Sequence, residues 1–147
     1  MDTLKISKRK EGCCMDRETY DALAKARIER AKELLEEAKL LLESGKYKSA
    51  NNRAFYSIEK SMKALLASKE IDADSHNGCL RQFNVHFIKD SVGGFGSGDY
   101  KRVADAQRIR NNSDYDDFYI ADKQECSNQV ATAEEFLKKA EEFLNTK

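Results

Sequence analysis

The chain has 147 residues, the usual size of one domain, with no proline, no tryptophan and a mean hydropathy of −0.75. Its 26 basic and 26 acidic side chains cancel, which excludes a global field that draws the protein to nucleic acid or to an anionic membrane. No stretch approaches the roughly 18 apolar residues of a membrane span, and the first residues hold no apolar signal-peptide core. We therefore expect a cytoplasmic protein that does not contact a membrane.

The chain begins with residues 1–18, which carry the basic run Lys8–Lys10 and no sustained apolar period. We expect a loose arm there, followed by one domain over residues 19–147. Without proline, helices are favoured wherever apolar residues recur at steps of three and four. Such steps predict a first helix from Tyr20 to Ser44 whose inward positions are Ala24, Ile28, Ala31, Leu35, Ala38 and Leu42.

Two further helices are predicted before the glycine-rich stretch at 93–98. One runs from Lys46 to about Lys69, and its inward positions are Ala54, Phe55, Ile58, Met62, Leu65 and Leu66. The other runs from His76 to about Lys89, with Ser75 as its N-cap and with the apolar face Cys79, Leu80, Phe83 and Phe87. Residues 93–98 follow a helix rather than a strand and lack the Lys-Ser/Thr of a phosphate loop, so we interpret them as a flexible connection.

The fourth predicted helix, from about Asp99 to Asn112, has an unusual inward stripe. The stripe starts apolar and turns polar, in the order Tyr100, Val103, Ala104, Gln107, Arg110, Asn111 and Asp114. Burying a guanidinium without partners costs several kcal/mol, so we expect Arg110 to face a paired partner, a subunit interface or a wet cleft. A capped helix end, with a cation near its C-terminus, is the alternative, and composition alone does not decide between them.

A fifth helix is predicted from about Lys123 to Leu144, and its inward positions are Cys126, Val130, Ala133, Leu137, Ala140 and Leu144. The whole is then an all-α, antiparallel up-and-down bundle of about five helices. In the second helix, Arg53 and Tyr56 share a face. They either line the cleft of Arg110 or form a packed Arg stem against a ring.

The cysteines have neither the spacing nor the paired histidines of a zinc site, and the spacing of a bundle di-iron site is also missing. We expect no metal and no cofactor. Cys79 and Cys126 are predicted to be small core residues, with Cys13 and Cys14 in the arm.

The motifs, taken in order, resemble the HEPN (higher eukaryotes and prokaryotes nucleotide-binding) superfamily over about residues 20–145. The resemblance rests on these segments: Gly45 to Tyr56, Lys63 to Leu66, Ser75 to Gly78, Phe83, Phe87 to Lys89, Arg110-x-x-x-Asp114-Tyr115-Asp116 and Ala133 to Leu137. It implies an antiparallel helical bundle that forms a homodimer, with the fourth helices of two subunits meeting in a cleft. It also implies a metal-independent endoribonuclease or an RNA- or nucleotide-binding component of a toxin–antitoxin or defence system, often with a nucleotidyltransferase-type antitoxin.

One departure from the family pattern concerns the chemistry. The family motif has His several residues after the Arg, and this chain has Tyr115 at that place, although Arg110 and Asn111 match the start of the motif. An imidazole with a pKa near 6.5 suits proton removal from a 2′-OH at neutral pH, whereas phenols titrate near pH 10. On this resemblance Arg110, Asp114 and Tyr115 would be catalytic, with Asp114 as the next candidate base.

The resemblance also assigns RNA or nucleotide binding to Arg110 and Asn111, with Arg53 and Tyr56 as further residues of the cleft. Two alternatives remain open at this point. One is a non-catalytic HEPN dimer that binds nucleotide or a partner nucleotidyltransferase. The other is a purely structural helical dimer in which Arg110 pairs with Asp114 of the other subunit. The charge is unevenly distributed, because residues 111–147 hold four lysines and nine acidic residues.

Overall fold

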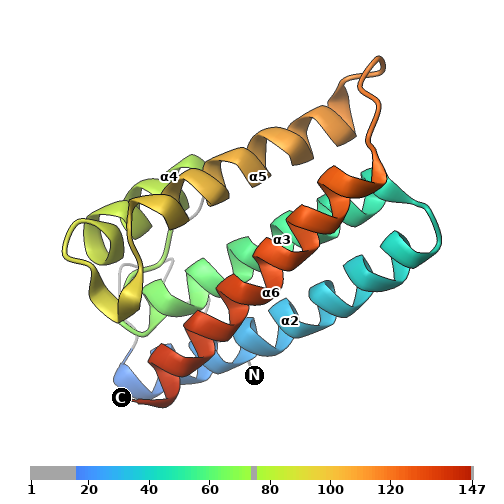
Figure 1. The fold of residues 1–147 in the computed structure, drawn as a ribbon. Helices are drawn as coiled ribbons and strands as arrows, with labels where there is room; N and C mark the ends of the chain where they lie inside the picture. Colours follow the sequence, from blue (N-terminus) through green and yellow to red (C-terminus); the bar gives the residue numbers. More distant parts are fainter. Residues whose placement is uncertain (1–15, 74–75, 147) are drawn as a thin grey trace.

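The computed structural model describes residues 16–73 and 76–146, which form helices without any strand. The four long helices are α2 (Arg17–Glu43), α3 (Tyr47–Ala67), α5 (Ser97–Tyr115) and α6 (Lys123–Asn145). The short helix α4 (His76–Phe83) continues into a π-helical turn over Asn84–Ile88. Figure 1 shows the long helices side by side and alternating in direction, which confirms the expected all-α antiparallel bundle.

Residues 1–15 and 74–75 lie outside this description, and with them most of the predicted arm, its two cysteines and the expected cap Ser75. The helix α2 begins after Asp16, which caps it: the Oδ1 of Asp16 accepts a hydrogen bond of 2.8 Å from the Thr19 amide.

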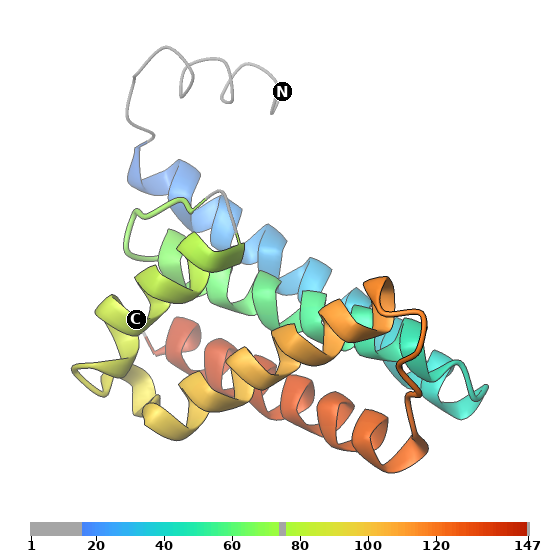
Figure 2. The ribbon, with the colours of Figure 1, turned by 90° about the horizontal axis from the view of Figure 1, so that it is seen from above.

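The antiparallel register of α2 and α6 is visible in two ion pairs. Lys32 Nζ lies 2.9 Å from Glu141 Oε2, and Lys39 Nζ lies 2.9 Å from Glu134 Oε2. From the first pair to the second, the position in α2 increases by seven residues while the position in α6 decreases by seven, as expected for antiparallel helices. The remaining helices arrange around α3, which contacts α2, α4, α5 and α6. Figure 2 shows α3 lying between α2 and α5.

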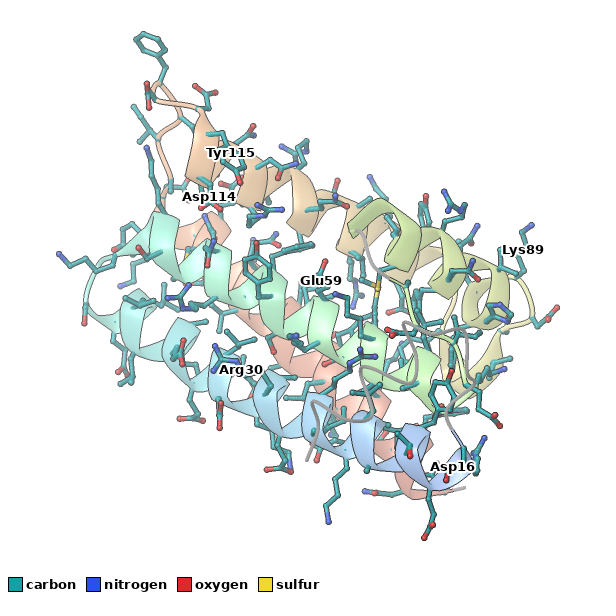
Figure 3. All side chains as sticks on the ribbon, turned by 180° about the vertical axis from the view of Figure 1, so that it is seen from behind. Asp16, Arg30, Glu59, Lys89, Asp114 and Tyr115 are labelled. Atoms are coloured by element: carbon teal, nitrogen blue, oxygen red, sulfur yellow. The ribbon has the colours of Figure 1, made fainter. Side chains whose placement is uncertain are left out.

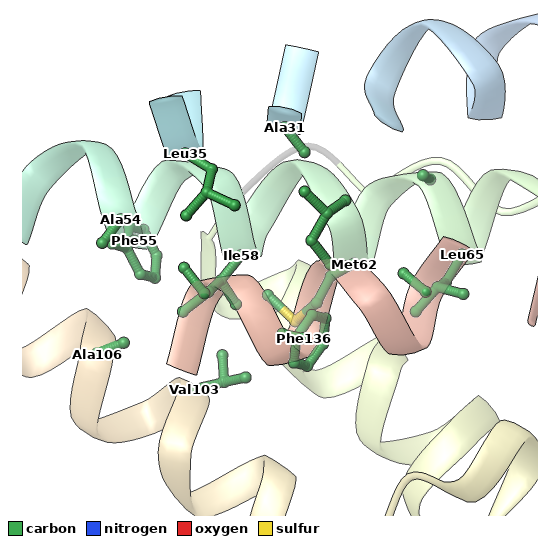
Figure 4. Close-up of a cluster of buried hydrophobic side chains, with 14 of the residues drawn as sticks. Ala31, Leu35, Ala54, Phe55, Ile58, Met62, Leu65, Val103, Ala106 and Phe136 are labelled. Carbon is green, nitrogen blue, oxygen red and sulfur yellow. The ribbon is translucent and has the colours of Figure 1, made fainter. Parts of the chain in front are cut away.

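The core forms where the predicted apolar stripes meet. Figure 4 shows Leu35 of α2, Ile58 and Met62 of α3, Val103 of α5 and Phe136 of α6 converging, and each of these is buried. The inward positions predicted for α3 are all buried, and those predicted for α2 are buried except Leu42, which is partly buried against the core. Periodicity therefore located the core of these helices correctly. Cys79 and Cys126 are buried and carry free thiols, as expected.

The glycine-rich stretch does connect α4 to α5, but an aromatic side chain anchors it. Phe95 is 1% exposed, and its ring centroid lies 5.2 Å from that of Phe83 and 5.3 Å from that of Phe136. Gly93 has a φ of +66°, and a Cβ there would come within 2.8 Å of Phe143 Cδ1. The glycine thus allows the chain to turn close against an aromatic ring.

Two predictions for α5 need correction. The helix does not end at about Asn112 but continues to Tyr115, and its buried face was predicted only in part. Tyr100 is 37% exposed and Asn111 is exposed, while Ala106, Ile109 and Ser113 are buried alongside Val103 and Arg110. Contacts with another helix explain why α5 continues to Tyr115. Hydrogen bonds from α3 hold the last turn of α5 in helical form despite residues that favour a helix end.

Candidate functional site

The site centres on Arg110, a charged residue that is only 4% exposed. Its guanidinium carbon lies 5.2 Å from the ring centroid of Phe55, 5.4 Å from that of Tyr56 and 5.8 Å from that of Tyr115. Each of these distances is within the range in which a ring attracts a cation. Two helices supply the rings, so the guanidinium is enclosed between α3 and the end of α5.

The end of α5 is positioned by two neighbouring asparagines in the first turns of α3. Asn51 Nδ2 donates to Ser113 Oγ at 3.1 Å in the buried contact, and Asn52 Nδ2 donates to Asp114 Oδ2 at 2.9 Å nearer the surface. Figure 3 shows Asp114 and Tyr115 at this end of α5, over the beginning of α3. Because α5 stays helical here, Arg110 and Asp114 are one turn apart on one face.

A continuous chain of polar contacts crosses the site from α2 to α5. Glu37 Oε1 accepts from Arg53 Nε at 2.8 Å, and Arg53 Nη1 donates to Asn52 Oδ1 at 2.6 Å. Asn52 then holds Asp114, whose Oδ2 also lies 3.5 Å from Arg110 Nη1. The same Arg110 Nη1 also lies 3.4 Å from the Tyr115 hydroxyl oxygen. The two contacts of Arg110 are long for charge-assisted hydrogen bonds, which are usually 2.7–2.9 Å.

Two buried polar atoms at the α3–α5 contact have no hydrogen-bond partner within the described residues. They are Nε of Arg110 and Oδ1 of Asn51. A buried donor without a partner costs about 1–3 kcal/mol, so it calls for an explanation other than stability. The guanidinium therefore keeps an unused donor in addition to its long contacts, and an anion is the natural partner for such a donor.

The structure brings most of the predicted site residues together. Asp114, Tyr115 and Tyr56 all contact or face Arg110, and Arg53 joins them indirectly through Asn52. Asn111 does not join them, because it is exposed and follows Arg110 by one residue, which turns it to another side of α5.

Sequence reasoning missed Glu37, Asn52 and Ser113 as parts of this site. The pair Asn51-Asn52 in the first turns of an otherwise apolar helical face is the signal that points to a polar contact there. No sequence signal identifies Glu37, since it lies on a helix rich in surface carboxylates.

Beside the buried guanidinium, three large apolar side chains are exposed among the aspartates of the same segment. Tyr115 is 74% exposed, Phe118 is 93% exposed and Ile120 is 85% exposed, all within the last residue of α5 and the loop after it. The loop is braced at its end, because the Tyr119 hydroxyl hydrogen-bonds to Glu125 Oε1 of α6. Adjacent exposed rings and aliphatic groups on a short segment are typical of an interaction surface.

Within residues 16–73 and 76–146, no three His, Cys, Asp or Glu side chains gather closely enough to hold a metal ion. None of the helices in those ranges combines the length and the apolar character needed to cross a bilayer. Burial raises the pKa of the Cys79 thiol to about 12 and that of Cys126 to about 11, so neither is an activated nucleophile.

Comparison with known proteins identifies relatives of the whole bundle. The profile of the HEPN domain family matches residues 24–144. "Putative toxin MJ0142" of Methanocaldococcus jannaschii is 32% identical over 120 residues, which are 82% of this chain and 80% of that protein. "UPF0332 protein PH1297" of Pyrococcus horikoshii is 44% identical over 61 residues, or 42% of this chain and 43% of that protein. "Putative toxin MJ0605" of M. jannaschii is 34% identical over 74 residues, or 50% of this chain and 52% of that protein.

Proposed function

This chain belongs to the HEPN domain family, and from that premise we propose that it is a metal-independent endoribonuclease acting as a toxin. The observation that carries the proposal is the buried Arg110, enclosed by three rings, with one donor unused and with Asp114 and Tyr115 beside it. Burying such a charge lowers the stability of the fold, so a purely structural role does not explain it, whereas its donors are well suited to hold a phosphate. The names of two relatives as putative toxins support the biological role.

Access for the phosphate follows from the contacts of Tyr115. Its side chain is 74% exposed and touches the guanidinium only through a contact of 3.4 Å, so moving it aside costs little buried surface. A phosphate that enters there exchanges the two long contacts of Arg110 for shorter charge-assisted hydrogen bonds. The guanidinium then stabilises the negative charge that develops on the phosphorus oxygens during attack.

The proposed reaction is transesterification within the RNA strand. Within the described residues only Oδ2 of Asp114 is engaged, by Asn52 and Arg110, so Oδ1 takes the proton of the ribose 2′-OH. The 2′ oxygen bonds to phosphorus and the bond from phosphorus to the 5′ oxygen breaks. Tyr115 gives its hydroxyl proton to the departing oxygen, and the proton on Asp114 returns to Tyr115 through water. The products are a 2′,3′-cyclic phosphate and a 5′-hydroxyl.

A homodimer completes this proposal. Arg110 is covered in the single chain, while Tyr115, Phe118 and Ile120 are exposed beside it. A second copy that covers these apolar side chains would bring two such sites into one cleft and shield the chemistry from water. A nucleotidyltransferase-type antitoxin is the partner that the family membership suggests, and it would act on the same exposed segment.

A non-catalytic role is the second candidate, and a specific feature favours it. Tyr115 stands where the family motif has His, so a cleft that retains Arg110 and Tyr56 is able to bind a nucleotide without cutting RNA. The purely structural dimer, in which Arg110 pairs with Asp114 of another subunit, is less favoured because Asp114 already contacts Arg110 and Asn52 within one chain.

The test is incubation of purified protein with single-stranded RNA in EDTA, beside an Arg110→Met variant and a Tyr115→His variant. The ribonuclease proposal expects cleavage by the native protein, loss of at least 100-fold in rate for Arg110→Met, and a gain for Tyr115→His. No Arg110-dependent cleavage of any RNA would leave the nucleotide-binding role as the function to test.

A further inference from the structure

The outward side of α3 carries a line of basic and aromatic residues that starts at the site and leads away from it. Arg53, Tyr56, Lys60 and Lys63 follow one another at steps of three, four and three, which places them on one helical face. All four are partly exposed. We call these four residues the α3 stripe. Figure 3 shows α3 with α2 below it and α5 above it.

The two lysines of the stripe hold charges that the fold leaves uncompensated. No ion pair or side-chain hydrogen bond within the described residues involves the ammonium of Lys60 or of Lys63. The nearby arginines differ in this respect, because Arg53 pairs with Glu37 at 2.8 Å and Arg27 of α2 pairs with Asp72 at 3.1 Å. Within the stripe, an ion pair therefore holds Arg53, whereas Lys60 and Lys63 have no such pair among the described residues.

The lysines are also crowded by other cations. Arg27 Nη1 donates to the backbone oxygen of Lys63 at 3.2 Å, which brings the guanidinium against this turn of α3. Partial burial, and then the charges of Lys63, Arg27 and Arg30, lower the pKa of Lys60, with the adjacent Glu59 opposing them only in part. Three cations, Lys60, Lys63 and Arg27, therefore lie at this turn, and the carboxylates near them are Glu59 and the Asp72 that pairs with Arg27.

We infer that the α3 stripe is a phosphate-binding track that holds a single-stranded RNA beyond the nucleotide bound at Arg110. Lys63 lies ten residues after Arg53, about 15 Å along the helix axis at 1.5 Å per residue. The rise per nucleotide of a duplex strand is about 3.4 Å and that of an extended single strand is larger, so this length spans at most about four nucleotides. Alternation of basic side chains with a ring is the usual composition of such a track, because cations meet the backbone and rings meet the bases.

The inference rests on the proposed function and extends it, since it names a single strand of several nucleotides as the substrate class. It also explains how a neutral protein binds a polyanion. The acidic residues that prevail after residue 111 lie on α5, the following loop and α6, whereas the stripe is on α3. A bound phosphate would relieve the repulsion among Lys60, Lys63 and Arg27, which adds to binding at this turn.

The test measures binding rather than cleavage. A fluorescent 12-nucleotide RNA with 2′-O-methyl groups throughout cannot undergo 2′-OH attack, and its affinity is measured by anisotropy at 50–200 mM salt, as a rough working range. The variant is Lys60→Gln/Lys63→Gln, which removes both charges and leaves a polar, helix-compatible side chain at each position. The matched control is Lys101→Gln/Lys138→Gln, two exposed lysines, of which Lys101 is nine residues, or about two and a half turns, from Arg110 and so on the opposite face of α5.

We expect the stripe variant to bind roughly ten- to thirty-fold more weakly than the native protein and the slope of log K against log salt to fall by about 1.4. The control should match the native protein, and thermal melts of all three should agree within roughly 2 °C. Equal binding by the stripe variant and the control overturns the track, even if Arg110-dependent cleavage is found. Stripe-dependent binding without such cleavage keeps the track and overturns the ribonuclease. Equal competition by polyglutamate would assign the stripe to an acidic protein and overturn RNA as its ligand.

Discussion

Replacing Arg110 by methionine separates a functional guanidinium from a structural one. Methionine fills a similar volume without charge, so the substitution removes the ion from its enclosure and leaves little cavity. Asp114 is not stranded by the change, because its side chain is 24% exposed and Asn52 still donates to it at 2.9 Å. The loss is therefore confined to the interactions of the guanidinium itself.

Those interactions are individually weak. The two contacts of Nη1, at 3.4 and 3.5 Å, contribute about 1 kcal/mol each at most, and the three ring contacts together contribute about 2 kcal/mol. Against them stands the desolvation of a buried ion, which is several kcal/mol, together with about 1–3 kcal/mol for the unpaired Nε. The costs therefore equal or exceed the gains. We expect Arg110→Met to change the free energy of unfolding by less than about 1 kcal/mol, or to raise it.

The opposite substitution should behave differently. Asp114→Asn removes the one carboxylate beside a guanidinium that is 4% exposed, so the buried charge loses its nearest counter-ion. We expect a loss of about 1–3 kcal/mol, and recovery when Arg110→Met is combined with it.

Urea unfolding, followed by circular dichroism on all three variants, measures these differences. A loss of about 3 kcal/mol or more for Arg110→Met would refute the reasoning, since it would make Arg110 a structural residue.

Three other predictions concern separate parts of the fold. Iodoacetamide at pH 8 should leave Cys79 and Cys126 unmodified in the folded protein and label both in guanidinium, because burial raises their thiol pKa values to about 12 and about 11. Peptide mass spectrometry measures the labelling. Rapid labelling of the folded protein would show that the core opens. Gly93→Ala should lower the free energy of unfolding by about 2 kcal/mol or more, because its φ is +66° and the new methyl would lie 2.8 Å from Phe143 Cδ1. Thermal melting measures the loss. The control Gly94→Ala, where nothing lies within 4 Å of the new methyl, should lose less. Phe118→Ser should leave the melting temperature nearly unchanged, because the ring is exposed. If this ring joins two copies of the chain, the substitution should shift the mass measured by light scattering from dimer toward monomer. An unchanged dimer would place the interface elsewhere.

The sequence predicted most of the fold because apolar spacing determines which face of a long helix is buried. That argument succeeded for α2, α3 and α6, where the inward residues are almost all aliphatic or aromatic. It failed at the end of α5, where the residues are polar and favour a helix end. There the contacts Asn51 to Ser113 and Asn52 to Asp114 decide the structure, and no periodicity within α5 encodes a partner on α3.

The candidate site was predictable to a similar degree. Arg110 was expected to need a paired partner, an interface or a wet cleft, and the structure gives it Asp114, Tyr115 and the rings of α3. Asn111, which the same resemblance selected, points elsewhere because it follows Arg110 by one residue and so leaves that face of the helix. The rings that enclose the guanidinium were not foreseen, since they depend on how the end of α5 packs against α3.

The most direct test of the central claim is the initial rate of single-stranded RNA cleavage in EDTA by the native protein and by Arg110→Met, compared at equal folded concentration with a DNA of the same sequence as a further substrate. We expect the native protein to cut RNA to products with 2′,3′-cyclic phosphate ends and Arg110→Met to be at least 100-fold slower. The DNA should stay intact because it lacks the 2′-OH. Equal rates for the two proteins, or equal cleavage of the DNA, would contradict it.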